Sequence, residues 1–382
     1  MNAQSKKIVV CEGLRTPIGH LSKSLAHVPP EHLLKTVIEA LIARTGLDPQ
    51  EIDGAIMGWV GQGSHAPNLA RVATLISGIP ERAYAYTLQC NCVSGIEVIS
   101  SAARRILLGE GDLFLAGGTE SMSTFPYAIR GARSQKSLRS IDKLKANWAV
   151  LWDDPDISIV DCITEGLTDP VHHINMAQTA EVCAQKFSIS RQEQDEYAFE
   201  TFRRCLAGVS DGFYKTHLVP VEYRGDRVLA EDEYPSLRRK LVQNLDKFTK
   251  APLLFDRPDY PFARFYEDFS DEIAPGATID DTKAATVTLF NSCARSDGAA
   301  CVIVTSAEKA KSLGLTMLAE IKSWGYIGNN PAHMGIAPAY AGARALEQAG
   351  ISFRDLTSIE LHEAFAAKSS GTPGGICGTP AS

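Results

Sequence analysis

The sequence lacks any long uninterrupted run of apolar residues, and it lacks an amino-terminal signal peptide. A membrane-spanning helix needs about 20 consecutive apolar residues, so no membrane insertion is expected. An excess of positive charge is also lacking, because 45 aspartates and glutamates outweigh 38 lysines and arginines and give a net charge of −7. This balance gives no reason to expect nucleic acid or an anionic membrane as a partner.

A disulfide framework is lacking as well. The nine cysteines are odd in number and scattered, as in a reduced cytoplasmic protein rather than a secreted one. Cys90 and Cys92 form an isolated Cys-x-Cys with no second cysteine or histidine pair nearby, so no metal site is expected. A redox pair is an alternative that the spacing leaves open.

What is present is a cysteine between a strand-like and a helix-like segment. Residues 83–88 are rich in aromatic and β-favouring side chains, and residues 96–107 repeat apolar side chains at helical spacing. Cys92 lies between the two, where the free N–H groups of a helix start favour a thiolate. A thiolate on a rigid turn beside backbone donors is typical of an acyl-transfer nucleophile, although a buried apolar cysteine is the commoner alternative.

The chain divides into three parts by its pattern. Residues 1–126 alternate predicted strands and helices, which indicates an α/β fold. Residues 127–285 break this rhythm with a basic run and a proline-rich stretch, and contain an amphipathic helix at 190–208. Residues 286–382 resume the alternation. The predicted elements there are strands at 299–304, 318–326 and 358–362 and helices at 307–314 and 339–350.

Several different short motifs follow one another along the chain between residues 7 and 367. They are Arg15-Thr16-Pro17-Ile18-Gly19, Asn68-Leu69-Ala70-Arg71, Cys92-Val93-Ser94-Gly95, Gly117-Gly118-Thr119-Glu120, Met176-Ala177-Gln178-Thr179-Ala180-Glu181, Asp297-Gly298-Ala299-Ala300, His333-Met334-Gly335 and His362-Glu363-Ala364-Phe365. Each is weak alone, but together they resemble the thiolases, the acetyl-CoA acyltransferase family. The histidine in the last motif resembles the trifunctional-type β-oxidation variant.

The resemblance implies a thiolase-like α/β fold in which two related βα halves stack in αβαβα layers, with an inserted loop domain. Residues 1–126 would form the amino-terminal half with the nucleophile, and 127–285 the loop domain and the return to the first half. Residues 286–382 would form a carboxy-terminal half that is truncated after about residue 367. A homodimer or homotetramer is expected.

The implied chemistry is acyl transfer between coenzyme A thioesters. Cys92 would take the acyl group and pass it to coenzyme A, or to the carbanion of acetyl-CoA, with acyl-CoA and coenzyme A as substrates and no further cofactor. His362 would hold the water that binds the thioester oxygen, whereas a histidine that only orients Glu363 is the alternative.

The substrate-binding residues implied by the motifs are Met176, Asn291, Cys293, Ala364 and Phe365. Met176 and Phe365 would line the pantetheine channel, or else belong to the ordinary core. Cys293 stands where the family has a serine that touches the pantetheine, and Phe290 adds bulk beside it. The basic run at 130–145 would meet the phosphates of coenzyme A, or else form a solvated face.

The clearest departure from the family follows Ala367. The family's Gly-His-Pro histidine and Cys-x-Gly-Gly-Gly cysteine are not found, and Cys377 does not have the setting of that base. Residues 368–382 are mostly Gly, Pro, Ser and Thr, so they are predicted to form no helix or strand. A general base contributes about 10²–10⁴ in rate, so impaired turnover is expected. A catalytically inactive thiolase-fold binding or assembly protein is the alternative function.

Overall fold

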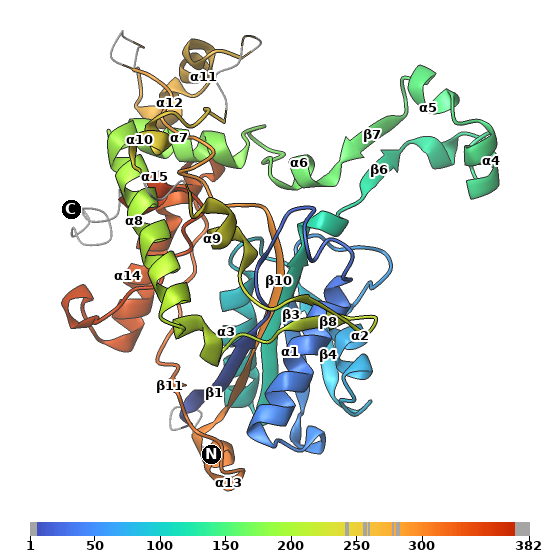
Figure 1. Cartoon of the computed structure of the whole chain (residues 1–382), viewed down its shortest axis with the longest axis vertical. Coiled ribbons are helices and arrows are strands. Elements are labelled where there is room, and N and C mark those ends of the chain that lie inside the picture. The colour runs from blue at the N-terminus through green and yellow to red at the C-terminus, as the bar shows by residue number, and fades with distance from the viewer. Residues whose placement is uncertain are drawn as a thin grey trace.

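A mixed sheet of seven strands lies at the centre of the computed structural model, which describes residues 6–240, 244–254, 258, 260–276, 279 and 283–370 (Figure 1). The strand order is β11-β1-β10-β5-β3-β4, and β2 pairs with β10. The strands are β1 (Ile8–Arg15), β2 (Gly19–His20), β3 (Gly54–Gly58), β4 (Tyr84–Leu88), β5 (Leu113–Ser121), β10 (Ser296–Ser306) and β11 (Ala319–Glu320). β3 runs parallel to β4 and β5, whereas β10 runs antiparallel to β1 and β5.

Helices cover both faces of this sheet. The helices are α1 (Pro30–Thr45) and α2 (Leu69–Ile76) on one face and α3 (Ser94–Leu108) on the other. Successive side chains of a strand point to opposite faces, so Leu113 and Leu115 of β5 join the α1 core while Phe114 and Ala116 join the α3 core. The alternating pattern of residues 1–126 therefore gave the correct elements, with apolar side chains buried on both sides of the strands.

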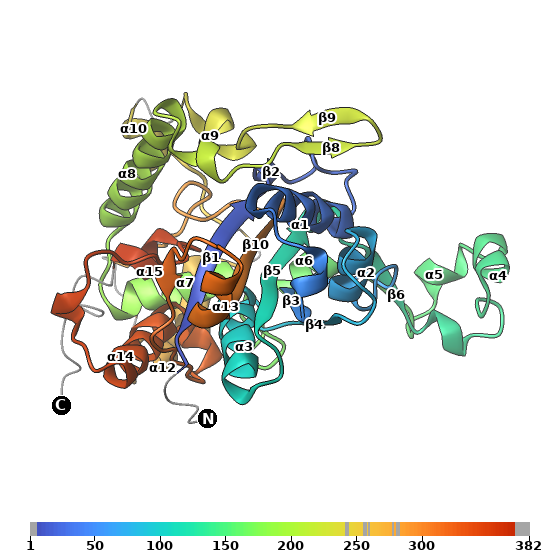
Figure 2. The same cartoon turned by 90° about the horizontal axis from the view of Figure 1, so that it is seen from below.

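A second apolar core lies outside the sheet. It is built by α7 (Met176–Lys186), α11 (Phe262–Asp268), α12 (Ser270–Ile273) and α15 (Ala366–Ser370). A smaller cluster beside it joins α8 (Arg191–Ser210) to the other side of α15. The helix predicted at 190–208 is confirmed as α8, and it begins with a capping box in which Ser190 and Glu193 exchange hydrogen bonds. α15 packs against both α7 and α8, as Figure 2 also shows.

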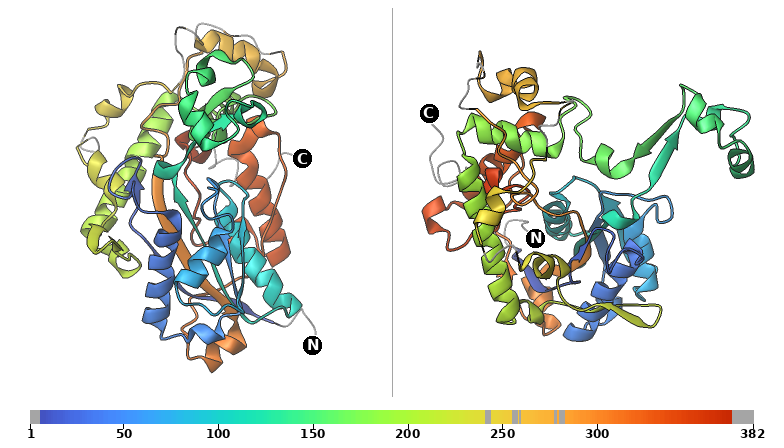
Figure 3. Two further views of the ribbon diagram at one scale, coloured as in Figure 1. Left: turned by 90° about the vertical axis from the view of Figure 1, so that its right-hand side faces the viewer. Right: turned by 45° about the horizontal axis from the view of Figure 1, so that its top comes forward.

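The remaining elements are connections and small appendages. They are α4 (Ile141–Ala146), α5 (Val150–Asp153), α6 (Cys162–Gly166), α9 (Glu233–Arg238), α10 (Asp246–Thr249), α13 (Ala307–Ser312) and α14 (Ala337–Ala349), with the strand pairs β6 (Tyr127–Arg130) to β7 (Ser158–Asp161) and β8 (Val221–Tyr223) to β9 (Asp226–Leu229). β6, α4, α5 and β7 form an arm that projects away from the sheet (Figures 1 and 3).

Two strands predicted in the last third are corrected by the structure. The segment predicted at 318–326 contributes only the two residues of β11, and the segment predicted at 358–362 is not a strand. An extended segment becomes a strand only when a neighbour completes its hydrogen-bond ladder. The first segment finds such a neighbour only where residues 319–320 pair with β1, and the second pairs with no described strand, so the described residues of this region show no second sheet.

Other predictions for this region are confirmed or remain predictions. α13 and α14 are confirmed as helices, although α14 has no buried side chain. The division at residues 126 and 285 stays a prediction. β10, from the third segment, pairs with β1 and β5 in the first sheet.

The tail predicted to be featureless from residue 368 is corrected in part. Lys368 belongs to α15, because Ala366 and Ala367 are buried and hold that helix against its neighbours. The rest of that prediction, including Cys377, lies outside the described residues. In the part of the chain that is described, no helix is long and apolar enough to cross a membrane.

Candidate active site

Cys92 lies exposed in the connection between β4 and α3, as predicted. Asn91 before it has a φ of 50°, in the left-handed region that asparagine tolerates better than most residues. The Ser94 hydroxyl accepts a 2.9 Å hydrogen bond from the N–H of Cys90 and donates a 2.7 Å bond to the carbonyl of Asn91. The first residue of α3 thus ties down the turn that carries the thiol.

The end of β3 lies unusually close to this turn. A Cβ on Gly58 would lie 2.7 Å from the Cβ of Ser94, which is too close for any side chain. Glycine at this position therefore lets the start of α3 approach the sheet. Cys92 is consequently held at the carboxyl edge of the parallel strands, which is where α/β folds bind their ligands.

His362 precedes the short turn that leads into α15. The N–H of Ala364 donates a 3.0 Å hydrogen bond to the carbonyl of His362. The imidazole keeps exposed surface, but desolvation by the surrounding protein, followed by the nearby ammonium of Lys368, lowers the pKa of His362. A neutral imidazole at pH 7 can donate from one ring nitrogen and accept at the other.

Cys293 lies beside the segment that carries His362. The N–H of Cys293 donates to the carbonyl of Ala364 at 2.9 Å, and the N–H of Ala366 donates to the carbonyl of Asn291 at 2.8 Å. Burial of one side of the thiol, followed by the charge of a Cys92 thiolate, raises the pKa of Cys293. Cys92 and Cys293 are therefore within electrostatic reach of each other, although they are far apart in the sequence.

The side chain of Asn291 makes its hydrogen bonds to other groups within the protein. Its side-chain oxygen accepts a 2.7 Å bond from the N–H of Thr288, and its amide group donates to Asp195 and to the carbonyl of Thr286, each at 3.1 Å. The residue is buried. The geometry favours a role in holding the turn before Cys293 over direct contact with a substrate.

Met176, Ala364 and Phe365 all belong to the second apolar core. Ala364 and Phe365 are buried, and the half-buried Met176 packs against the same cluster. The surroundings of these side chains therefore match the alternative in which Met176 and Phe365 belong to the ordinary core. A contact with substrate at the border of this cluster stays a prediction.

Two residues of this region were not singled out from the sequence. Lys368 on α15 carries an ammonium whose charge helps to lower the pKa of His362 and opposes the burial that raises the pKa of Cys183 and Cys293. Cys183 on α7 is buried, and burial raises its pKa to about 11.

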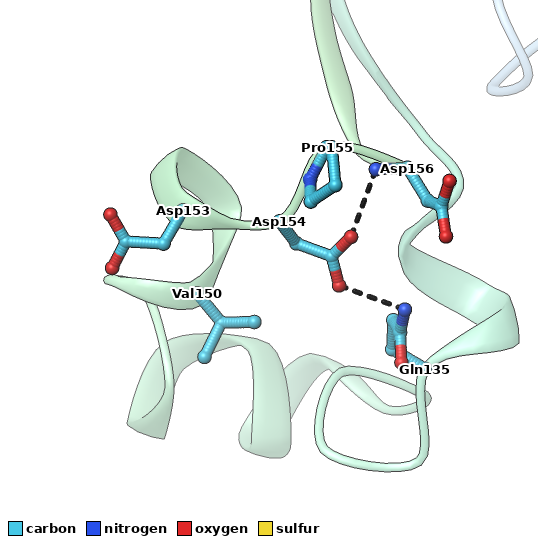
Figure 4. Close-up of a pocket in the computed structure, with 6 residues that line it drawn as sticks. All are labelled: Gln135, Val150, Asp153, Asp154, Pro155 and Asp156. Carbon is cyan, nitrogen blue, oxygen red and sulfur yellow. Dashed lines mark hydrogen bonds between the residues drawn. The ribbon is translucent and has the colours of Figure 1, made fainter.

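A shallow, open hollow lies elsewhere, on the arm (Figure 4). It measures about 430 Å³, and its wall consists of Gln135, Val150, Asp153, Asp154, Pro155 and Asp156. Asp154 already accepts hydrogen bonds from the side chain of Gln135 at 2.8 Å and from the N–H of Asp156 at 2.9 Å. These bonds fold the arm onto itself, so the hollow is distinct from the site around Cys92.

The basic run at 130–145 also lies on this arm. Its lysines and arginines are exposed, and Arg130 forms an ion pair with Glu165. The arrangement fits the solvated-face alternative, and a contact with phosphates remains a prediction. Across the described residues, no group of three or more His, Cys, Asp and Glu side chains is placed to hold a metal ion.

Comparisons with known proteins identify the family. The model of the thiolase amino-terminal domain matches residues 8–252, and that of the thiolase carboxy-terminal domain matches residues 315–371. A protein of Pseudomonas aeruginosa named acetyl-CoA acetyltransferase is 33% identical over 95% of this chain and 82% of its own length. A β-ketothiolase of Cupriavidus necator shows the same identity over 95% and 82%.

Solved structures agree with the sequence matches. The acetyl-CoA acetyltransferase of Bacillus anthracis has a TM-score of 0.81 and 31% identity, covering 97% of this chain and 84% of its own. Human mitochondrial 3-ketoacyl-CoA thiolase in complex with CoA has a TM-score of 0.80 and 29% identity, with coverage of 97% and 82%. The predicted fold family is confirmed, and the relatives' names do not favour the alternative of an inactive binding protein.

Proposed function

The chain belongs to the thiolase family, and from that membership we propose that Cys92 carries the acyl group which this thiolase-type acyltransferase moves between coenzyme A thioesters. The observation that supports this role best is the exposure of Cys92 on a turn fixed by Ser94 at the start of α3. Among the described cysteines, Cys11, Cys183 and Cys301 are buried and therefore poorly suited to meet a substrate.

In the first step, the Cys92 thiolate attacks the thioester carbonyl. A tetrahedral intermediate forms, and its oxygen takes the negative charge. The coenzyme A thiolate then leaves, and the acyl group stays bound to Cys92 as a thioester. In the second step of synthesis, a second acetyl-CoA gives its α-proton to a base, and the carbanion attacks this new thioester and restores the Cys92 thiolate. Thiolysis is the reverse: Cys92 attacks the 3-keto carbonyl, acetyl-CoA leaves as the carbanion and takes up a proton, and the coenzyme A thiolate then attacks the acyl-cysteine. The reaction needs no cofactor beyond the coenzyme A thioester in this scheme.

In this proposal, His362 stabilises the oxygen of the thioester by hydrogen bonding. Its lowered pKa keeps the ring neutral near pH 7, so one N–H is available to hold a water or the oxygen itself. Glu363 supports this position by accepting hydrogen bonds from the hydroxyls of Tyr197 and Thr201 on α8. The one carboxylate of the motif, that of Glu363, is thereby assigned to structure rather than to proton transfer.

The substrate contacts are proposed along the border between α7 and the segment 291–293. Cys293 lies at this border with exposed surface, and Met176, Ala364 and Phe365 supply the apolar wall behind it. Asn291 contributes by fixing the turn before Cys293. The human relative's complex with CoA supports coenzyme A as a ligand of this chain.

The active form is proposed to be a homodimer or homotetramer of the cytoplasm. β4 is an edge strand whose Tyr84 is 59% exposed, and nearby Ile96 of α3 is 64% exposed. An unpaired edge beside exposed apolar side chains suits pairing with a second copy. All described cysteines are free, which suits a reducing compartment. A monomer in analytical ultracentrifugation at micromolar concentration would oppose the assembly.

Turnover with acetoacetyl-CoA and coenzyme A tests the function. The unaltered protein should release acetyl-CoA, Cys92→Ala should lose the activity entirely, and Cys90→Ala should keep most of it. Cys90 is the matched control because it is also exposed and lies two residues away. Equal turnover in the two variants would show that Cys92 is not the nucleophile.

A further inference from the structure

Cys90 and Cys92 lie on the same exposed turn before α3. Every residue from 89 to 93 is exposed, so the described part of the protein leaves both thiols open to solvent. The N–H of Val93 donates a 3.3 Å hydrogen bond to the carbonyl of Cys90, which closes a β-turn with Cys90 at its first position and Cys92 at its third. A small solute can therefore reach either sulfur.

This turn also keeps the two cysteines close together. Two Cα atoms with one residue between them are at most about 7 Å apart in an extended chain, and a β-turn brings them nearer. Disulfides join Cα atoms that are about 4.4–6.8 Å apart. The φ of 50° at Asn91 and the two hydrogen bonds of the Ser94 hydroxyl fix the compact form of the turn. The spacing of the pair therefore lies within the reach of a disulfide.

Cys90 is the best-placed partner for an oxidised Cys92. Of the other described cysteines, three are buried, two are half-buried, and Cys293 is exposed on the segment before β10. Only one residue of chain separates Cys90 from Cys92, and groups held together in this way react much faster than groups that must first meet. All described cysteines are free, so the structure shows the reduced form of the pair.

We propose that Cys90 is the resolving thiol of Cys92, so that oxidation by a hydroperoxide closes a disulfide across this turn and reversibly stops acyl transfer. The loss of acyl transfer rests on the proposed function of Cys92 as the nucleophile, whereas the formation of the disulfide does not. An exposed cysteine with a second thiol beside it is typical of redox sensors. Transient disulfides of this kind are the ones that reducing compartments contain.

Each disulfide consumes one hydroperoxide. The Cys92 thiolate attacks a peroxide oxygen, the O–O bond breaks, and the alkoxide or hydroxide that leaves takes up a proton, which makes Cys92 a sulfenic acid. The Cys90 sulfur then attacks the Cys92 sulfur. The S–S bond forms as the S–O bond breaks, and the hydroxyl group leaves with the Cys90 proton as water. The two sulfurs lose two electrons, which the peroxide accepts, and an added dithiol returns them because an exposed disulfide is open to thiol attack.

Peroxide treatment of the full chain, read by peptide mass spectrometry, tests the proposal. Trypsin leaves both cysteines on one peptide, which spans residues 83–104. After hydrogen peroxide and alkylation of the remaining thiols, this peptide should have lost two hydrogens and should carry no alkyl group. Turnover of acetoacetyl-CoA with coenzyme A should fall about tenfold or more, because the disulfide leaves no thiolate, and should return with dithiothreitol.

Cys90→Ala separates the roles of the two thiols. This variant keeps its turnover before oxidation, but peroxide should carry its Cys92 on to the sulfinic acid. Dithiothreitol does not reduce a sulfinic acid, so the recovered turnover should be at least about tenfold lower than in the unaltered protein. Cys293→Ala is the matched control at the other exposed cysteine, and its 83–104 peptide should still lose two hydrogens.

The outcomes separate this inference from the function beneath it. If the 83–104 peptide keeps two free thiols or only gains oxygen, the inference is overturned. A disulfide from Cys92 to Cys293, or equal recovery of Cys90→Ala and the unaltered protein, would also overturn it. If the disulfide forms and turnover is unchanged, Cys92 is not the nucleophile, so the proposed function fails while the disulfide between Cys90 and Cys92 is supported.

Discussion

The hydroxyl of Tyr197 on α8 donates a 2.5 Å hydrogen bond to the carboxylate of Glu363, which follows His362 in the chain. Thr201, one turn further along α8, donates to the other oxygen at 2.8 Å. The long helix of the loop region therefore holds the histidine segment through both oxygens of one side chain. We call the two hydrogen bonds from Tyr197 and Thr201 to Glu363 the clamp. The position of His362 depends on this clamp more than on regular secondary structure, because residues 356–363 form no helix or strand.

Removal of one hydroxyl from the clamp should impair both stability and catalysis. Tyr197→Phe should lower the free energy of unfolding by about 1 kcal/mol, the usual net value of one hydrogen bond. The acylation rate should fall more steeply, because His362 would lose its fixed position. Urea denaturation and stopped-flow acylation measure the two effects. Tyr127→Phe on the exposed arm is the control, and an equal loss in that variant would contradict the clamp.

The turn that carries the nucleophile should depend on the Ser94 hydroxyl. Ser94→Ala removes the acceptor of the Cys90 N–H and the donor to the Asn91 carbonyl. The expected cost is about 1–2 kcal/mol of unfolding free energy, with slower acylation of Cys92 by acetyl-CoA. Ser101→Ala removes a hydroxyl from the same helix that bonds only to Glu97 and Arg104, and it should leave acylation intact. Unimpaired acylation in the Ser94 variant would show that the turn holds its shape without this side chain.

Glu181 should make the stability of the protein decline as the pH rises from 5 to 7. Burial raises the pKa of this carboxyl despite its hydrogen bonds from Gln185, Thr286 and Val287. Above the unfolded value of about 4.3 the folded state then holds more protons than the unfolded state, so unfolding free energy is lost as pH increases. Glu181→Gln should show a smaller decline than the unaltered protein.

Glu193→Gln is the control for that prediction, because its shift has the opposite sign. The hydrogen bonds from Ser190 lower the pKa of Glu193, so its contribution is present above the unfolded value and is lost only as the pH falls below it. Between pH 5 and 7 the control should follow the unaltered protein. Denaturation curves at pH 5 and pH 7 measure the free energy of unfolding of each variant. If the free energy of Glu181→Gln declines as much as that of the unaltered protein, Glu181 is not the cause of the decline.

The protection of backbone amides from hydrogen exchange should differ sharply between the sheet and the segment at 357–361. Val302 and Val304 lie in the middle of β10, which is bonded on both sides. No hydrogen bond from the amides of residues 357–361 to another described residue is found, and Ile359 is exposed. Hydrogen exchange of the latter should be faster by about two orders of magnitude or more. Similar protection in both places would mean that the segment is paired in solution.

Local pattern was enough to predict the elements around Cys92. The β-favouring run at 83–88 and the helical spacing after Cys92 depend on residues close in sequence, and the structure has β4 and α3 there. The positive φ of Asn91 was not foreseen, because it follows from the way Ser94 ties the turn rather than from composition.

Non-local partners account for what the sequence did not reveal. The segments at 318–326 and 358–362 have strand composition, but a strand also requires a neighbour that composition does not specify. The internal role of Asn291 depends on Asp195, which is 96 positions away. Lys368 was grouped with a glycine- and serine-rich tail, whereas its surroundings are set by α7 and by the turn at 291–293.

The most direct test of the account is the mass of the protein after incubation with acetyl-CoA. The account predicts a single acetyl adduct that maps to the peptide containing Cys92, disappears on addition of coenzyme A, and is absent from Cys92→Ala. An adduct on Cys90 or Cys293 instead, or no adduct in a folded protein, would contradict it.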